Sequence, residues 1–384
     1  MQKIPVAWLS LIHNRRRLAA SLAGVTFAVL LMFIEMGFLN GVYDSQTILV
    51  DVLDADLVMM NRQKEDILPV LPFSRRRLEQ ALSIEGVASA YSLYMEEFRA
   101  IFKNFNPDKT SGIAVLAYNP AYEVINIPEV LKQTNLLYKF DTALVDDHSR
   151  DLFGKLTPGV KAELNGRKIN LAGTFDLGPN FRSDGYLIMS DQNFFRYFPD
   201  KKTGIPDKDT IEFGLIKVKK GFLIEQVEKS LNKELPGDVI VRTRQELADH
   251  IKSFWRDFQP IGAVFGLGAA VGFLIGVAVC YQILYTDITD NLAQYATLKA
   301  LGSKNSYLVG LVTRKAVLLA IGGFLLGLVL TGTIYDTLQR LSGIKMSLTF
   351  DRALMILGLS ILMCILSGLF AVRRALRLDP AELF

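Results

Sequence analysis

The residue types that most often carry chemistry are few and scattered in this sequence. The three histidines, His13, His148 and His250, lie in separate regions and show neither an HExxH motif nor the spacing of a Cys/His metal site. The one Gly-Lys pair, Gly154-Lys155, lacks the preceding glycine and the following Ser or Thr of a phosphate-binding P-loop. We therefore expect no catalytic, cofactor-binding or metal-binding residue here, and we interpret the histidines as ordinary surface or interface residues.

The composition indicates a membrane protein. Half of the 384 residues are hydrophobic, and the formal net charge of +4 is too small to indicate nucleic-acid binding. The two cysteines, Cys280 and Cys364, both lie in apolar stretches, so no disulfide framework is expected.

Four apolar stretches are long enough to cross a bilayer as helices. We predict spans over residues 18–41, 258–285, 316–336 and 353–372. The first span follows a basic segment, as in a signal peptide, but its apolar core is longer and no convincing cleavage site follows. An uncleaved membrane anchor is therefore expected.

The basic residues near the span ends predict the orientation. Segments 1–17, 286–315 and 373–384 together carry eleven Lys and Arg near the spans, whereas the short loop 337–352 carries three. Because cytoplasmic loops are enriched in Lys and Arg, both termini are expected in the cytoplasm. Residues 42–257 would then lie outside the cytoplasm, and the chain would be a multi-pass membrane protein.

The region 42–257 has the mixed patterning of an α+β domain. Residues 55–61 and three short pieces, IAVLAYN, INLAGTF and YLIMS, suggest strands, and residues 74–87 suggest a helix. Four further segments follow as strand, helix, strand and helix, in that order: 212–220, 222–235, 238–243 and 244–258. We expect a membrane-proximal lobe from 42–118 and 206–257, and a distal lobe from 119–205. The fold class predicted is thus an integral α-helical membrane protein of four transmembrane helices, with a large α+β domain outside the cytoplasm between helices 1 and 2.

Glu35 is the one carboxylate well inside a span. Acids inside a membrane are costly and often functional. Glu35 is, however, only about six residues from the outer end of its span, roughly 9 Å at 1.5 Å per residue. It is therefore interpreted either as a carboxylate at headgroup level or as a contact in a dimer interface or substrate entrance.

Small residues recur at intervals along the second and third spans, which lets helix backbones approach closely. This pattern fits packing within one chain and packing between two copies equally well. No span has the polar stripe that a path for a hydrophilic substrate requires. The glycines concerned are Gly262, Gly266, Gly268, Gly272 and Gly276 in the second span, and Gly323 and Gly327 in the third.

The segment 287–302 predicts a short amphipathic helix ended by Gly302. Leu292, Tyr295, Leu298 and Leu301 lie near one face. A helix lying on the membrane usually carries several basic residues, and this one has Lys299 alone. Docking into the groove of a partner protein is therefore favoured over a membrane-surface helix.

At this segment the chain resembles a known family. YQILYTDITDNLAQYATLKALG is similar to the cytoplasmic coupling segment of FtsX/MacB-type (type VII) ABC transporter permeases, most closely the DevC family of exporter permeases. AGVTFAVLLMFIEMGF, FDLGPNFRSDGYLIMSDQNFF, PIGAVFGLG and MCILSGLFAVRRALRLDPAELF also resemble that family, so the likeness covers essentially the whole chain. One departure is Gln294, where relatives commonly have glutamate.

The resemblance implies a MacB-like fold and a non-catalytic permease that transmits motion. It also implies a location in the inner (plasma) membrane, with the α+β domain between helices 1 and 2 in the periplasm. It implies a homodimer, a DevA-like ABC ATPase that binds ATP and Mg, a DevB-like adaptor, a TolC-like outer-membrane duct and contact with membrane lipids. The cargo expected by analogy is a glycolipid or another lipophilic compound taken from the periplasm or the outer leaflet. Stalk helices are expected near 42–53 and 244–258.

The coupling helix to the ATPase is expected at residues 290–301, followed by a cytoplasmic tail near the ATPase. The coupling residues are Asp290, Leu292, Gln294, Tyr295, Leu298, Lys299, Leu301 and Gly302, and the tail residues are Arg373, Arg374, Arg377, Asp379 and Pro380.

Two other functions remain open. One is an FtsX-like regulator of an external hydrolase, which transports nothing, although such regulators have smaller external parts. The other is a lipoprotein-release permease, which would need a periplasmic acceptor instead of an adaptor.

Overall fold

The computed structural model describes residues 15–66, 70–97, 99–105, 108–150, 153–154, 156–178, 183–199, 207–258, 260–292, 297, 304–342 and 346–376. The chain forms two compact units. The helical unit comprises Met1–Asn40, Ile261–Gln339 and Met346–Phe384, and the sheet unit comprises Gly41–Pro260 and Arg340–Lys345.

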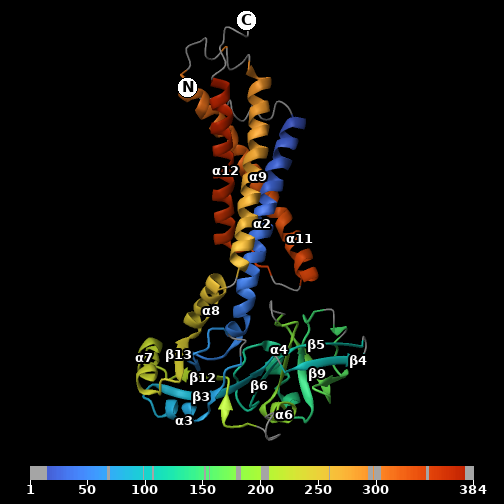
Figure 1. The fold of residues 1–384 in the computed structure, drawn as a ribbon, viewed down its shortest axis with the longest axis vertical. Coiled ribbons are helices and arrows are strands. Elements are labelled where there is room, and N and C mark those ends of the chain that lie inside the picture. The colour runs from blue at the N-terminus through green and yellow to red at the C-terminus, as the bar shows by residue number, and fades with distance from the viewer. Residues whose placement is uncertain are drawn as a thin grey trace. The chain divides into compact units, whose positions relative to one another are not determined.

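Four long helices run through the helical unit (Figure 1): α2 (Arg15–Val52), whose last residues belong to the sheet unit, α9 (Ile261–Asp290), α11 (Asn305–Ser342) and α12 (Phe350–Leu376). Each is long and apolar enough to cross a membrane. The four predicted spans are thereby confirmed as helices. Three of the helices, α2, α11 and α12, extend beyond both ends of the apolar stretch, because the flanking polar residues continue the helix.

The four helices share one core of buried side chains. Val25 and Val29 of α2, Leu284 of α9 and Met363 of α12 belong to it, as does Ala316 of α11. The two cysteines lie in the same core with their Sγ atoms 3.5 Å apart and both thiols free.

The sheet unit contains thirteen strands within the described residues. They are β1 (Leu57–Asn61), β2 (Phe73–Ser74), β3 (Val87–Glu96), β4 (Ile101–Phe105), β5 (Asp108–Gly112), β6 (Ala114–Tyr118), β7 (Thr142–Asp146), β8 (Lys161–Leu164), β9 (Arg167–Phe175), β10 (Tyr186–Ser190), β11 (Thr210–Ile211), β12 (Phe213–Val218) and β13 (Val239–Thr243). Its helices, besides the end of α2, are α3 (Arg76–Leu82), α4 (Pro128–Lys132), α5 (Thr134–Leu137), α6 (Asp191–Tyr197), α7 (Ile224–Glu234) and α8 (Arg244–Phe258).

Eleven of the strands form one mixed sheet in the order β13-β1-β12-β3-β6-β10-β7-β9-β8-β4-β5. The pairs β6–β10 and β7–β9 are parallel and the other pairs are antiparallel. Alternate residues of β1, Leu57 and Met59, point into a core that also contains Leu78 of α3 and Val227 of α7. This core runs the length of the sheet.

The predicted strands at 55–61, in the three short pieces and in 212–220 and 238–243 are confirmed as β1, β6, β9, β10, β12 and β13. The predicted helices at 222–235 and 244–258 correspond to α7 and α8, and α3 is shorter than the predicted 74–87. The two lobes stay a prediction. Strands from both predicted lobes belong to one sheet. Strands β4 and β6, from the segment predicted as membrane-proximal, pair with β8 and β10 of the segment 119–205, and β5 pairs with β4.

Helix α8 packs against the end of α2 inside the sheet unit. Nζ of Lys252 lies 3.3 Å from Oδ1 of Asp44, and Nη1 of Arg244 donates to the carbonyl oxygen of Leu53 over 3.0 Å. From the same helix, Nε1 of Trp255 donates to Asp66 over 3.1 Å. The two helices expected as a stalk are therefore joined to each other and to the loop after β1.

Candidate functional site

A cluster of charged side chains joins three helices of the helical unit at one end. Asp287 and Asp290 lie in the last part of α9, Arg17 in the first turn of α2, and Lys315 in α11. Nζ of Lys315 lies 2.8 Å from Oδ2 of Asp287, and Nη1 of Arg17 lies 2.9 Å from Oδ2 of Asp290 and 4.0 Å from Oδ1 of Asp287. We call these four residues the ion-pair cluster.

The two carboxylates of the cluster have different surroundings. The Lys315 side chain is 2% exposed and that of Asp287 is 13% exposed, whereas that of Asp290 is 58% exposed. A buried ion pair loses much more free energy when one partner is removed than an exposed pair does. The Asp287–Lys315 contact therefore dominates the cluster energetically.

The local sequence of α9 makes these cations necessary. A helix C-terminus carries partial negative charge, so acidic residues in the last turns are unfavourable there. Helix α9 has Asp287 and Asp290 near this end and no basic residue in its last turn. Arg17 and Lys315 from the neighbouring helices supply the missing positive charge. The end of α9 is thus stabilised only while α2 and α11 stay in place.

Close contacts at glycines bring the helix backbones together. A Cβ at Gly276 of α9 would lie 2.9 Å from Cβ of Ala28, one at Gly327 of α11 2.8 Å from Cγ1 of Val29, and one at Gly323 2.8 Å from Cβ of Val25. Cβ atoms essentially never come this close, so only glycine fits these positions without a shift.

The remaining predicted glycines differ in their surroundings. Gly272 faces Leu31 and Gly268 faces the Glu35 carboxylate, whereas a Cβ at Gly266 would have no neighbouring atom within 4 Å. Gly262 is half-buried in the first turn of α9. Packing within one chain thus accounts for several of these glycines, and packing between two copies stays a prediction.

Sequence reasoning missed further close approaches on the first helix. A side chain at Gly24 would meet Val279, at 2.9 Å, and one at Gly37 would meet Tyr335. The Tyr335 hydroxyl donates to the carbonyl oxygen of Phe33 over 2.6 Å. These isolated glycines lack a repeated spacing, which is the signal that marked the others.

Glu35 lies at the contact between α2 and α9, half-buried, next to Gly268. One turn further on, Phe38 stacks on Phe265 with ring centroids 5.8 Å apart. Glu35 therefore packs against the second span of its own chain. Its role at a dimer interface or substrate entrance stays a prediction.

The structure describes part of the predicted coupling residues. Asp290 is the last residue of α9 and Leu292 follows the helix, and Arg373 and Arg374 lie near the end of α12. The other predicted coupling and tail residues fall outside the described residues; they are Gln294, Tyr295, Leu298, Lys299, Leu301, Gly302, Arg377, Asp379 and Pro380.

Asp287 and Lys315 are the residues that sequence reasoning missed. The sequence reasoning used Arg17 and Lys315 only as positive charges that predict the orientation of the chain in the membrane. Nothing in the sequence showed which carboxylate each of them would pair with. The searched residues contain no group of three or more His, Cys, Asp or Glu that could hold a metal ion. The ion-pair cluster itself joins α2, α9 and α11.

Comparison with known proteins finds a family match for part of the helical unit. Residues 266–380 match the model of the FtsX-like permease C-terminal family. An uncharacterized ABC transporter permease of Methanocaldococcus jannaschii is 24% identical over 179 residues, which span 44% of this chain and 44% of that protein. The match thus covers less than half the length of this relative.

Two solved structures are similar to the sheet unit at a low level. One is the periplasmic region of MacB from Actinobacillus actinomycetemcomitans, with 11% identity and a TM-score of 0.35 over 52% of this chain and 94% of that one. The other is the extracellular domain of the ABC-type transporter YknZ from Gram-positive bacteria, with 12% identity and a TM-score of 0.34 over 49% and 99%. Scores this low carry no conclusion about this chain.

The family match includes the end of α9 with Asp287 and Asp290, all of α11 with Lys315, and α12. The four apolar helices and this match support a multi-pass membrane protein. The C-terminal region of the chain, residues 266–380, is an FtsX-like permease domain, and the chain is homologous to an ABC transporter permease.

Proposed function

We propose that this chain is the permease subunit of an ABC exporter and transmits motion without catalysing a reaction. The observation that carries the proposal is the ion-pair cluster within the helical unit. It joins α2, α9 and α11 where α9 ends, and it includes Asp290, the first residue of the predicted coupling segment 290–301. A displacement of that segment would act on three helices together, because the buried Asp287–Lys315 pair resists separation.

The partners follow from the family resemblance. A separate ABC ATPase would bind ATP and Mg and hydrolyse the nucleotide, and the permease would work as a homodimer in the inner membrane with both termini in the cytoplasm. An adaptor and a TolC-like duct would carry the cargo onward, and the cargo class would be a glycolipid or another lipophilic compound. Helix α8 and the end of α2, which are joined within the sheet unit, would serve as the stalk.

The test is purification of the tagged chain from membranes of its native cells after mild cross-linking. Mass spectrometry should identify an ABC ATPase, an adaptor and an outer-membrane duct. Recovery of a cell-wall hydrolase instead would favour the regulator, and recovery of a periplasmic lipoprotein carrier would favour the lipoprotein-release permease. Recovery of no ABC ATPase would contradict all three.

Leu298→Asp tests the coupling segment directly. It should abolish recovery of the ATPase while the chain still inserts into the membrane, because a carboxylate cannot enter an apolar groove without a large desolvation cost. Ser306→Asp, at an exposed position in the first turn of α11, is the matched control. Normal ATPase recovery and normal export with Leu298→Asp would count against a coupling role for this segment.

A further inference from the structure

Strand β3 has an unpaired edge in the middle of the large sheet. On one side β12 pairs along Val87–Leu93, whereas on the other side β6 pairs only with Tyr94–Glu96. Within the described residues, no backbone hydrogen bond reaches 88–92 from the β6 side. Alternate residues of an antiparallel strand point their N–H and C=O groups to opposite sides. Backbone donors and acceptors between Ala88 and Ser92 are therefore left open.

The edge is open because β6 ends early. Its register would continue alongside 88–92, but β6 stops at Tyr118, and the chain turns away at Asn119 and Pro120. The neighbouring strand β10 stops at Ser190 opposite Tyr118, and α6 begins at Asp191. Strand β3 thus extends past the ends of both neighbours on that side. An unpaired edge of this kind is a template for another strand.

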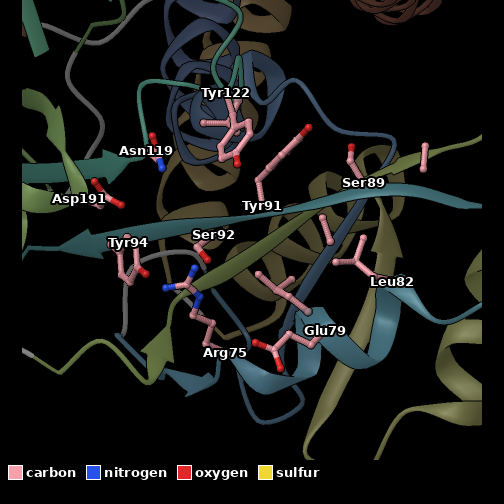
Figure 2. Close-up of a pocket in the computed structure, with 14 residues that line it drawn as sticks. Arg75, Glu79, Leu82, Ser89, Tyr91, Ser92, Tyr94, Asn119, Tyr122 and Asp191 are labelled. Carbon is pink, nitrogen blue, oxygen red and sulfur yellow. The ribbon is translucent and has the colours of Figure 1, made fainter. Parts of the chain in front are cut away.

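A groove of about 450 Å³ lies along this edge (Figure 2). Figure 2 shows β3 crossing the groove with Leu82 and Glu79 of α3 on one side and Tyr91 and Tyr122 on the other. The groove therefore reaches both faces of β3. That geometry suits an added strand, whose side chains point alternately to the two faces.

A large apolar side chain lines the groove on each face of β3 (Figure 2). Leu82 is 48% exposed and Tyr122 is 45% exposed, although both are large apolar side chains. Tyr122 stacks on Tyr91 with ring centroids 4.4 Å apart, which holds the aromatic wall in place. Each face thus offers a surface for the apolar side chains of a bound strand.

The charges in the groove are mixed, with an excess of carboxylate. Glu79 and Asp191 line it together with Arg75. Among the described residues, neither carboxylate forms an ion pair with a basic side chain. A ligand with a Lys or Arg side chain would complement this excess.

We propose that this groove binds an extended peptide segment of a partner protein by strand addition to Ala88–Ser92. The segment carries apolar side chains that contact Leu82 and Tyr122, and a basic side chain near Glu79 or Asp191. In strand addition the main chain supplies affinity and the alternate side chains supply specificity. The proposal goes beyond the permease function, because binding at this groove does not depend on transport or on an ATPase.

The test uses the full chain in detergent and a labelled synthetic peptide of alternating valine and threonine with a lysine at each end. Fluorescence anisotropy should show binding, and the same peptide N-methylated along its backbone should not bind, because it lacks N–H donors. Leu82→Asp and Tyr122→Ala should each weaken binding about tenfold or more. Leu223→Asp and Tyr138→Ala, at exposed positions outside the groove, should leave binding unchanged.

Hydrogen exchange locates the bound peptide. Alternate amides between Ala88 and Ser92 should exchange quickly in the free protein and become protected when the peptide binds. Equal binding of the N-methylated peptide, or failure of the unmodified peptide to bind at millimolar concentration, overturns the proposal. Protection of these amides without peptide also overturns it, because another segment or a second copy would then already occupy the edge.

Discussion

Replacing Asp287 by alanine should destabilise the helical unit far more than the same replacement at Asp290. Both residues lie near the end of α9, and both pair with a cation of another helix at almost equal distance, 2.8 Å and 2.9 Å. They differ in burial. Their side chains are 13% and 58% exposed, and those of their partners, Lys315 and Arg17, are 2% and 25% exposed.

The magnitude follows from that difference in burial. Breaking a buried pair by removing one partner costs roughly 3–5 kcal/mol, and the lower end applies here because Lys315 makes further interactions. A loss of about 3 kcal/mol lowers the folding equilibrium constant by more than about a hundredfold. The exposed Asp290–Arg17 pair contributes below about 1 kcal/mol. Both replacements remove an acid from the same helix end, so the effect of the helix dipole is similar for the two.

The assay is an unfolding titration of the full chain in mixed detergent and dodecyl sulfate micelles, followed by far-ultraviolet circular dichroism. The double variant Asp287→Ala/Lys315→Met should recover most of the loss, because an apolar pair replaces the buried charge. Equal destabilisation by Asp287→Ala and Asp290→Ala would refute the reasoning from burial. Failure of Lys315→Met to restore stability would show that Asp287 acts through another contact.

Two further predictions concern the two units separately. In the helical unit, Gly323→Leu should lower the free energy of unfolding by about 1–3 kcal/mol in the same titration, because the new side chain would overlap Val25. The control Gly332→Leu, on the same helix, has open space around it and should leave the stability unchanged. Equal effects of the two replacements would contradict the packing described. In the sheet unit, burial and the nearby Arg242 lower the pKa of His250, although Glu65 opposes this. The unfolded chain therefore binds this proton more readily, and stability should fall as the pH drops below about 6.5. Thermal unfolding between about pH 5 and pH 8 should show a weaker acid-side loss for His250→Gln than for the exposed His148→Gln. An unchanged acid-side loss in His250→Gln would assign it to other groups.

The open edge of β3 shows why part of the fold could not be predicted. The strands found from sequence, such as β10 with YLIMS, are short runs of large apolar residues with all positions buried. The first six residues of β3 read VASAYS, with small residues and no regular alternation of apolar and polar side chains. Only the last four residues of the strand are all buried. A strand that is paired on one side over part of its length has no regular pattern of burial. Its partners also come from distant parts of the sequence.

For the membrane-spanning helices and the ion-pair cluster, too, one part follows from the sequence and another part only from the tertiary structure. The length and apolarity of α2, α9, α11 and α12 are local properties, so the sequence alone determined that four helices are long and apolar enough to cross a membrane. It also determined where charged residues stand at the ends of those helices. Only the tertiary structure decided that Lys315 meets Asp287 and that Arg17 meets Asp290, because these contacts depend on which helices are neighbours and how they are rotated. Hydropathy contains no information on which helices are neighbours or on how each helix is rotated about its axis.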